Sequence, residues 1–133
     1  MRVLIVEDDI VIRSLLKVRI NKQFAKDADF EIESVARLQE ALAQMETFAP
    51  DVIILDLKLE DSEADETINA IPVLSYSAAV IVVSNGLTRD IIDQATSKGA
   101  CDVVDKFTLS IGSLKDKLNA AYYKRIFSLH HKD

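Results

Sequence analysis

Residues 50–56 read PDVIILD, so an unbroken run of branched apolar residues ends on a carboxylate, Asp56. Short continuous apolar runs of this kind are typical of strands buried on both faces, as in a parallel sheet. The run at residues 52–57 has counterparts at residues 3–6 (VLIV) and residues 79–83 (AVIVV). The sequence therefore predicts three central strands.

Two further strands and five helices are predicted around these runs. Residues 102–104 repeat the apolar pattern more weakly, and residues 30–35 alternate in polarity, as in a half-exposed strand. Helical spacing of apolar residues marks residues 12–20, 38–45, 91–95 and 114–125, and a poorly marked helix lies around residues 66–70. The residues with helical spacing in the first helix are Ile12, Leu15, Leu16, Arg19 and Ile20. We expect Asp9 and Thr88 to cap helix starts and Gly99 and Pro72 to end helices.

The regular alternation of strand and helix predicts one α/β domain. Alternating elements of this kind form a parallel sheet with right-handed crossovers and helices on both faces. No internal repeat or linker interrupts the pattern. We expect one domain over residues 1–128 and a polar, frayed tail over residues 129–133.

Composition excludes several classes of protein. The chain has 133 residues, 49% of them hydrophobic, and a net charge of −6, which argues against a direct nucleic-acid binder. Its longest apolar run, residues 78–83, is far shorter than the roughly twenty residues of a membrane span. The single cysteine, Cys101, favours a reducing compartment, and no signal peptide is recognisable. We therefore expect a cytoplasmic protein that does not associate with membranes.

The acidic residues are unevenly distributed. Residues 7–9 and 51–66 hold ten of the 22 acidic residues but a single base, Lys58. Because carboxylates gathered at one place repel one another, this concentration calls for a structural or chemical explanation.

Polar side chains follow four of the predicted strands. These are Glu7 and Asp8, then Asp56, then Ser84, and finally Lys106. Ligands of open α/β sheets bind outside the carboxyl ends of the strands, so we expect these side chains to converge. Converging carboxylates suit Mg²⁺, which takes oxygen ligands. A lysine and a hydroxyl can bind phosphate oxygens, and an aspartate can act as a nucleophile.

Each residue alone has a simpler interpretation. Asp9 is better explained as a helix cap, and a single Asp, Ser or Lys after a strand is usually a turn, capping or solvated residue. The combination at successive strand ends is what favours a site. With three glycines in the chain there is no glycine-rich phosphate loop, and no cysteine–histidine cluster has zinc spacing.

The chain resembles the receiver domain of response regulators. The matching stretches are VLIVEDD (residues 3–9), PDVIILD (50–56), IVVS (81–84) and GA (99–100) followed by Lys106. The resemblance extends from Met1 to about Ser128. It implies the CheY-like, flavodoxin-like fold, a five-stranded parallel sheet with strand order 2-1-3-4-5.

The resemblance also implies roles for individual residues. Glu7, Asp8, Asp56 and the backbone carbonyl of Lys58 would hold Mg²⁺. Asp56 would accept a phosphoryl group from a histidine kinase or histidine phosphotransfer protein, and Ser84 and Lys106 would bind its oxygens. The domain would catalyse its own dephosphorylation rather than act as a metabolic enzyme. An unidentified downstream protein would read the change on the face of the fourth helix, fifth strand and fifth helix.

Four positions depart from the family pattern. Phe107 replaces the usual proline after the lysine, and because a cis bond before a non-proline is costly, we expect the loop to differ. Asn85 replaces a small residue, and Val103 replaces the usual aromatic switch residue, so a coupling between Ser84 and an aromatic ring is not expected. Glu60 opens a run of acids where Pro and Gly are usual, and we expect a solvated, mobile loop there.

Two alternative functions stay open from the sequence. The departures at positions 85, 103 and 107 also suit a receiver-like binding module that is never phosphorylated. An aspartyl-nucleophile phosphohydrolase would also end a strand on Asp56, but such enzymes carry a second Asp where this chain has Lys58.

Overall fold

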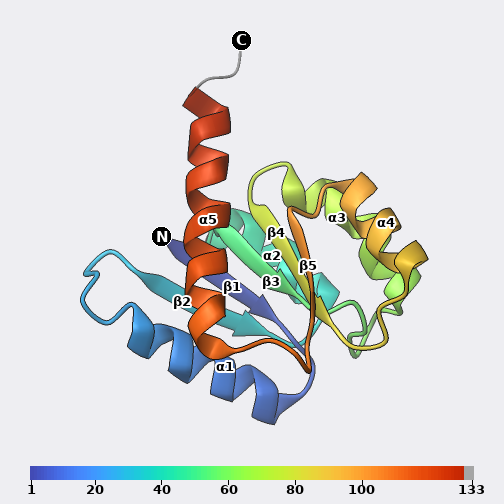
Figure 1. The fold of residues 1–133 in the computed structure, drawn as a ribbon, viewed down its shortest axis with the longest axis horizontal. Helices are drawn as coiled ribbons and strands as arrows, with labels where there is room; N and C mark the ends of the chain where they lie inside the picture. The colour runs from blue at the N-terminus through green and yellow to red at the C-terminus, as the bar shows by residue number, and fades with distance from the viewer. Residues whose placement is uncertain (131–133) are drawn as a thin grey trace.

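The computed structural model describes residues 1–130, in which five strands and five helices alternate (Figure 1). The elements are β1 (Arg2–Val6), α1 (Ile10–Gln23), β2 (Glu31–Val35), α2 (Leu38–Thr47), β3 (Val52–Leu55), α3 (Ala64–Ser75), β4 (Ala79–Ser84), α4 (Arg89–Lys98), β5 (Asp102–Asp105) and α5 (Ile111–His130). All strands are parallel, in the order β2-β1-β3-β4-β5. The predicted fold class and strand order are confirmed.

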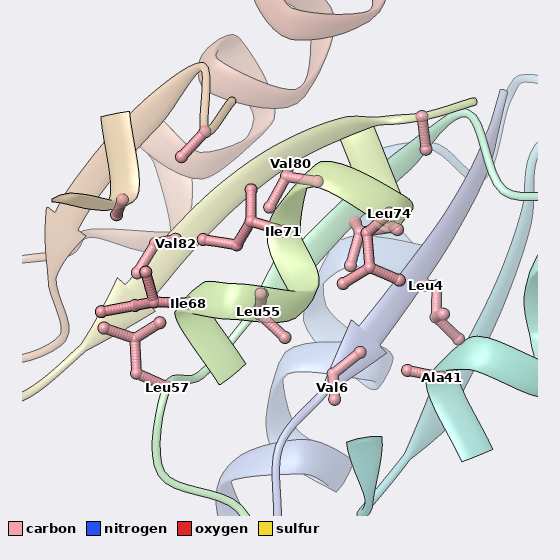
Figure 2. Close-up of a cluster of buried hydrophobic side chains, with 14 of the residues drawn as sticks. Leu4, Val6, Ala41, Leu55, Leu57, Ile68, Ile71, Leu74, Val80 and Val82 are labelled. Carbon is pink, nitrogen blue, oxygen red and sulfur yellow. The ribbon is translucent and has the colours of Figure 1, made fainter. Parts of the chain in front are cut away.

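The central strands are buried on both faces, as their apolar runs predict. Within β1, Val3 and Ile5 pack on the layer that contains α1 and α5, whereas Leu4 and Val6 pack on the layer of α2, α3 and α4. Figure 2 shows the buried side chains on the side of α2, α3 and α4, where residues from α2 and α3 meet the sheet. Burial on both sides fixes the register, because a slip of one residue would exchange the two faces.

Local capping signals define several helix ends as predicted. The Asp9 carboxylate accepts hydrogen bonds from the backbone N–H groups of Val11 (2.9 Å) and Ile12 (3.2 Å) at the start of α1. Thr88 caps α4 by accepting from the backbone N–H of a residue in its first turn, at 3.2 Å. Gly99 ends α4 with φ at 122°, a conformation that favours glycine.

The helically spaced residues predicted for α1 lie in a helix, but only some of them face the core. Leu16 and Ile20 are buried, but Leu15 is 46% exposed and Arg19 points to solvent. The helix buries a narrow stripe at i and i+4, and the residue just before it is turned away by about 100°. Helix α1 therefore has a second, exposed apolar face, which is made of Ile10, Val11, Leu15 and Val18.

Helices α3 and α5 are both longer than predicted. Helix α3 continues through Pro72 to Ser75, because Ile71 and Leu74 on either side of the proline are fully buried and their packing outweighs its cost. Helix α5 extends to His130, so the expected frayed tail begins in a helix, and residues 131–133 lie outside the described residues. None of the helices within residues 1–130 combines the length and apolar character that a membrane span needs.

Candidate functional site

The carboxyl ends of four neighbouring strands meet in one pocket of about 360 Å³. It is lined by Glu7, Asp8, Asp9, Ile12, Asp56, Lys58, Ser84, Asn85, Gly86 and Lys106. Each polar residue that the sequence analysis placed after a strand lies in this pocket. The parallel order of β1, β3, β4 and β5 is what brings these distant segments together.

Asp56 lies at the floor of the pocket and is 7% exposed. Its Oδ1 accepts a hydrogen bond from Ser84 Oγ at 2.8 Å, and its Oδ2 forms an ion pair with Lys106 Nζ at 2.8 Å. A buried carboxylate is stabilised only if such partners compensate for lost hydration. The strand ends thus hold Asp56 as a fixed carboxylate with a hydroxyl on one oxygen and an ammonium on the other.

Lys106 bridges Asp56 and Glu7, because the same ammonium also forms an ion pair with Glu7. Burial lowers the pKa of Lys106, but hydrogen bonds with Asp56 and Glu7 outweigh that effect and raise it above its ordinary value. Burial raises the pKa of Glu7 to about 7, partly opposed by hydrogen bonds from Lys106 and from the backbone of Asp9. The lysine therefore stays protonated between two carboxyl groups.

The acidic residues of the pocket form a group suited to a divalent cation. Glu7, Asp8 and Asp56 each present a carboxylate oxygen, and these atoms lie within 4.8 Å of one another. Asp8 is exposed while the other two are buried, so the group opens toward solvent. Oxygen ligands on one side and room for waters on the other fit Mg²⁺. Lys58 lines the same pocket.

One residue that shapes this group carries no signal in the sequence. Arg13, on α1, donates from Nη1 to the backbone carbonyl oxygen of Glu7 at 2.9 Å. Asp9 acts as the expected helix cap, and its backbone N–H also donates to Glu7 Oε2 at 3.1 Å. Nothing in the sequence marks an arginine within a helix as contacting the segment before that helix, so only the folded geometry reveals this contact.

The loop after β5 is built without the proline that the family usually has there. The peptide bonds of residues 1–130 are all trans, as expected for a loop with Phe107 after the lysine. The Asp105 side chain accepts a hydrogen bond from the backbone N–H of Phe107 at 2.8 Å and so shapes the turn. Phe107 itself is 85% exposed, Asn85 is exposed at the pocket, and Val103 is half-buried against the α3–α4 side of the core.

The acidic run after Asp56 is exposed as expected, but it is not a loose loop. Glu60 forms an ion pair with Arg37, and the Asp61 carboxylate accepts hydrogen bonds from the start of α2. Glu63 forms a capping box with Glu66 at the start of α3. These contacts join segments that are distant in sequence or depend on the exact helix start, which is why the sequence did not show them.

Comparison with known proteins identifies the family. A protein-family model described as the response regulator receiver domain matches residues 3–119. This chain belongs to the response regulator receiver domain family. It is therefore a receiver domain of two-component signalling with a CheY-like fold.

The relatives of this receiver domain differ in their length. It is 29% identical over 107 residues to the chemotaxis protein CheY of Listeria monocytogenes, covering 80% of this chain and 86% of that protein. It is 34% identical over 112 residues to the protein-glutamate methylesterase/protein-glutamine glutaminase of group 2 operon of Bradyrhizobium diazoefficiens, covering 80% of this chain. The match spans only 26% of the methylesterase.

A solved receiver domain has the same architecture over its whole length. The signal receiver domain of a putative Luxo repressor protein from Vibrio parahaemolyticus superposes with a TM-score of 0.79 at 27% identity. The alignment covers 99% of this chain and 98% of that one. Receiver domains generally bind Mg²⁺ at an acidic pocket and interact with kinases or phosphotransfer proteins. The acidic pocket of this chain lies at the carboxyl edge of its sheet.

Proposed function

We propose that Asp56 accepts a phosphoryl group from the phosphohistidine of a histidine kinase or a histidine phosphotransfer protein, in a reaction that depends on Mg²⁺. The observation that carries this proposal is the surroundings of Asp56, a buried carboxylate held by Ser84 and Lys106 beside two further acids. A structural aspartate at a strand end needs none of these neighbours.

The chemistry is an in-line displacement at phosphorus. A carboxylate oxygen of Asp56 forms the new O–P bond while the N–P bond of the phosphohistidine breaks. The bonding electron pair returns to the imidazole of the donor, which takes up a proton from solvent. Such transfers need positioning and charge neutralisation more than covalent help, and the pocket residues supply both.

Ser84 and Lys106 are placed to hold the transferred group. Both already contact the carboxylate oxygens of Asp56, so a small movement brings the hydroxyl and the ammonium to phosphoryl oxygens. Mg²⁺, when bound, would neutralise part of the negative charge of the phosphoryl group. Its ligands would be Glu7, Asp8, Asp56 and the backbone carbonyl of Lys58, residues that all line the pocket. Slow attack of water on the acyl phosphate would return the domain to its starting state.

The signal leaves the domain through its surface. Phosphorylation adds about −1.5 to −2 charges to the pocket, which draws Ser84 and Lys106 inward. Because these residues lie at the ends of β4 and β5, we propose that the change reaches a downstream protein through the face of α4, β5 and α5. Half-buried Val103 offers no aromatic ring to relay it. We place this activity in the cytoplasm, where the exposed thiol of Cys101 stays reduced.

Phosphorylation with a small donor tests the proposal. Wild-type protein incubated with Mg²⁺ and acetyl phosphate should gain the mass of one phosphoryl group, and the gain should disappear in Asp56→Asn. Asp102→Asn is a matched control, because Asp102 begins β5 and lies at the other end of that strand from Lys106. If the wild type shows neither a mass gain nor a Mg²⁺-dependent response to beryllofluoride, the chain is a non-phosphorylated binding module instead.

A further inference from the structure

Helix α2 begins without a cap of its own. Arg37 occupies its N-cap position and makes no side-chain hydrogen bond to the first turn. The first backbone N–H groups of a helix lack partners within the helix and need an outside acceptor. A capping residue from another part of the chain is therefore required.

Asp61 provides that acceptor from the β3–α3 loop, residues 56–63. Its Oδ1 accepts from the backbone N–H of Leu38 at 2.8 Å, and its Oδ2 accepts from that of Gln39 at 3.1 Å. Both carboxylate oxygens are thus used at the start of α2, and the bonds span more than 20 positions of sequence. These bonds keep the pKa of Asp61 below its ordinary value despite desolvation, which raises it.

The same contact restrains the backbone beside the phosphoacceptor. Leu59 and Ser62 exchange backbone hydrogen bonds of 2.9 and 3.3 Å, which closes a tight turn around Asp61. Leu57 and Leu59 are buried in the core, and Lys58 between them is exposed and lines the pocket. The position of Lys58 is therefore fixed by the core below and by the Asp61 turn beyond it.

We propose that Asp61 is a positioning residue of the metal site. By fastening the β3–α3 loop to the start of α2, it holds the backbone carbonyl of Lys58 where it can complete the ligand set of Glu7, Asp8 and Asp56. The inference rests on the proposed function, since it assigns Asp61 a role in the affinity of that site for Mg²⁺. Residues that orient metal ligands typically change affinity 10- to 100-fold when they are removed.

Titration of the folded protein with MgCl₂ tests this role. We expect Asp61→Ala to bind Mg²⁺ about tenfold more weakly by isothermal titration calorimetry. Asp61→Asn keeps one acceptor oxygen, and because Asn is a good N-cap residue it should recover part of the affinity. The amide resonances of Lys58 should shift in Asp61→Ala, which an effect on α2 alone would not produce.

Thr88→Ala is the matched control for lost capping. It removes a side-chain cap whose hydrogen bond lies within the start of α4 itself, and it should cost similar stability while leaving Mg²⁺ affinity unchanged. Arg37→Ala removes a second link between the start of α2 and the same loop, the ion pair with Glu60, and because this pair is exposed its loss should change the affinity less than twofold.

The outcomes separate this inference from the proposed function. If wild type binds Mg²⁺ and both Asp61 variants bind it equally well, the positioning role is overturned and the proposed function stands. A similar loss of affinity in Thr88→Ala also overturns it, since the effect would then be one of general stability. If wild type does not bind Mg²⁺ at all, both proposals fail. Should Asp61→Ala not fold, Asp61→Asn decides alone.

Discussion

At the scale of single residues, Lys106 is the group on which the balance of the pocket depends. Its ammonium lies between the buried carboxyl groups of Glu7 and Asp56 and is itself largely buried. Removing one partner of a buried ion pair leaves uncompensated charge, which costs more than the pair contributes. Here one lysine has two such partners, so its removal leaves two buried carboxyl groups without their cation.

Replacing this lysine should therefore make stability depend on a divalent cation. We expect Lys106→Met to lower the free energy of unfolding by about 3 kcal/mol without Mg²⁺. Saturating Mg²⁺ should raise the free energy of unfolding of Lys106→Met by more than it raises that of wild type. Urea denaturation with and without Mg²⁺ measures both. Lys17→Met is the control, because its ion pair with Glu33 is exposed and 3.8 Å long, and it should change stability by less than about 1 kcal/mol.

An equal loss with and without Mg²⁺ in Lys106→Met would mean that the lysine acts only by packing. A loss in Lys17→Met as large as that in Lys106→Met would show that the effect does not arise from the pocket.

At the scale of elements, the end of α4 is a place where the backbone admits little change. Gly99 has φ at 122°, and a Cβ built there would lie 2.5 Å from Ser75 Oγ and 3.2 Å from Ser75 Cβ. Glycine is required both by the backbone angle and by the close approach of α3. This end also leads directly into β5, so its geometry sets where the last strand begins.

We expect Gly99→Ala to lower the free energy of unfolding by more than about 1 kcal/mol. Gly112→Ala is the matched control, since it lies in α5 with no atom within 4 Å of its added Cβ, and it should be neutral or raise stability by up to about 1 kcal/mol. Thermal unfolding of the two variants beside wild type gives the comparison. Equal thermal midpoints for Gly99→Ala and Gly112→Ala would contradict this prediction, because the ends of α3 and α4 would then move apart at little cost to fit the added methyl group.

The same scale shows what the sequence could predict and what it could not. The buried strands were predictable because every residue of β3 and β4 is apolar until the polar end, and a short run rich in β-branched residues is typical of a strand buried on both faces. The caps Asp9 and Thr88 were predictable because their partners lie within three residues. The continuation of α3 past Pro72 was not, because it depends on burial of Ile71 and Leu74 by other elements.

The residues of the candidate site likewise divide into those that the sequence could predict and those that it could not. The side chains after the strands could be grouped because topology alone brings the carboxyl ends of parallel strands together. The contacts of Arg13 and Asp61 could not be predicted, because each joins a side chain to backbone groups that only the fold places nearby. The exposed position of Leu15 was missed for a related reason, since apolar character alone does not tell which face of a helix meets the sheet.

At the scale of the whole molecule, the net charge of −6 now has a structural account. Some of the clustered acids gather in the pocket, and others, such as Asp9, Asp61 and Glu63, satisfy helix starts. Negative charge near helix N-termini is favourable, so these acids stabilise the fold in addition to being exposed to solvent. In the pocket, Glu7, Asp8 and Asp56 gather around the single ammonium of Lys106 that pairs with two of them.

Folding and cation binding should therefore be linked. The acids of the pocket come from two segments that are far apart in the unfolded chain, so Mg²⁺ binds the folded state. At a concentration about 100 times its dissociation constant, Mg²⁺ should raise the free energy of unfolding by about 2.7 kcal/mol. Asp8→Asn should reduce this increase. Thermal unfolding in MgCl₂ and in NaCl of equal ionic strength separates binding from screening, and identical curves in the two salts would contradict the linkage.

The strand order also has a consequence for synthesis. Strand β1 lies inside the sheet, yet one of its two partners, β3, begins only at residue 52. At the usual pace of about 5–20 residues per second, a ribosome finishes β3 roughly 3–10 s after β1. During that interval β2 is the only neighbour with which β1 can pair, and the other edge of β1 has unpaired backbone N–H and C=O groups. The edge of β1 that faces β3 thus stays unpaired until residues 52–55 have been made, so the centre of the sheet cannot close before β3 is available.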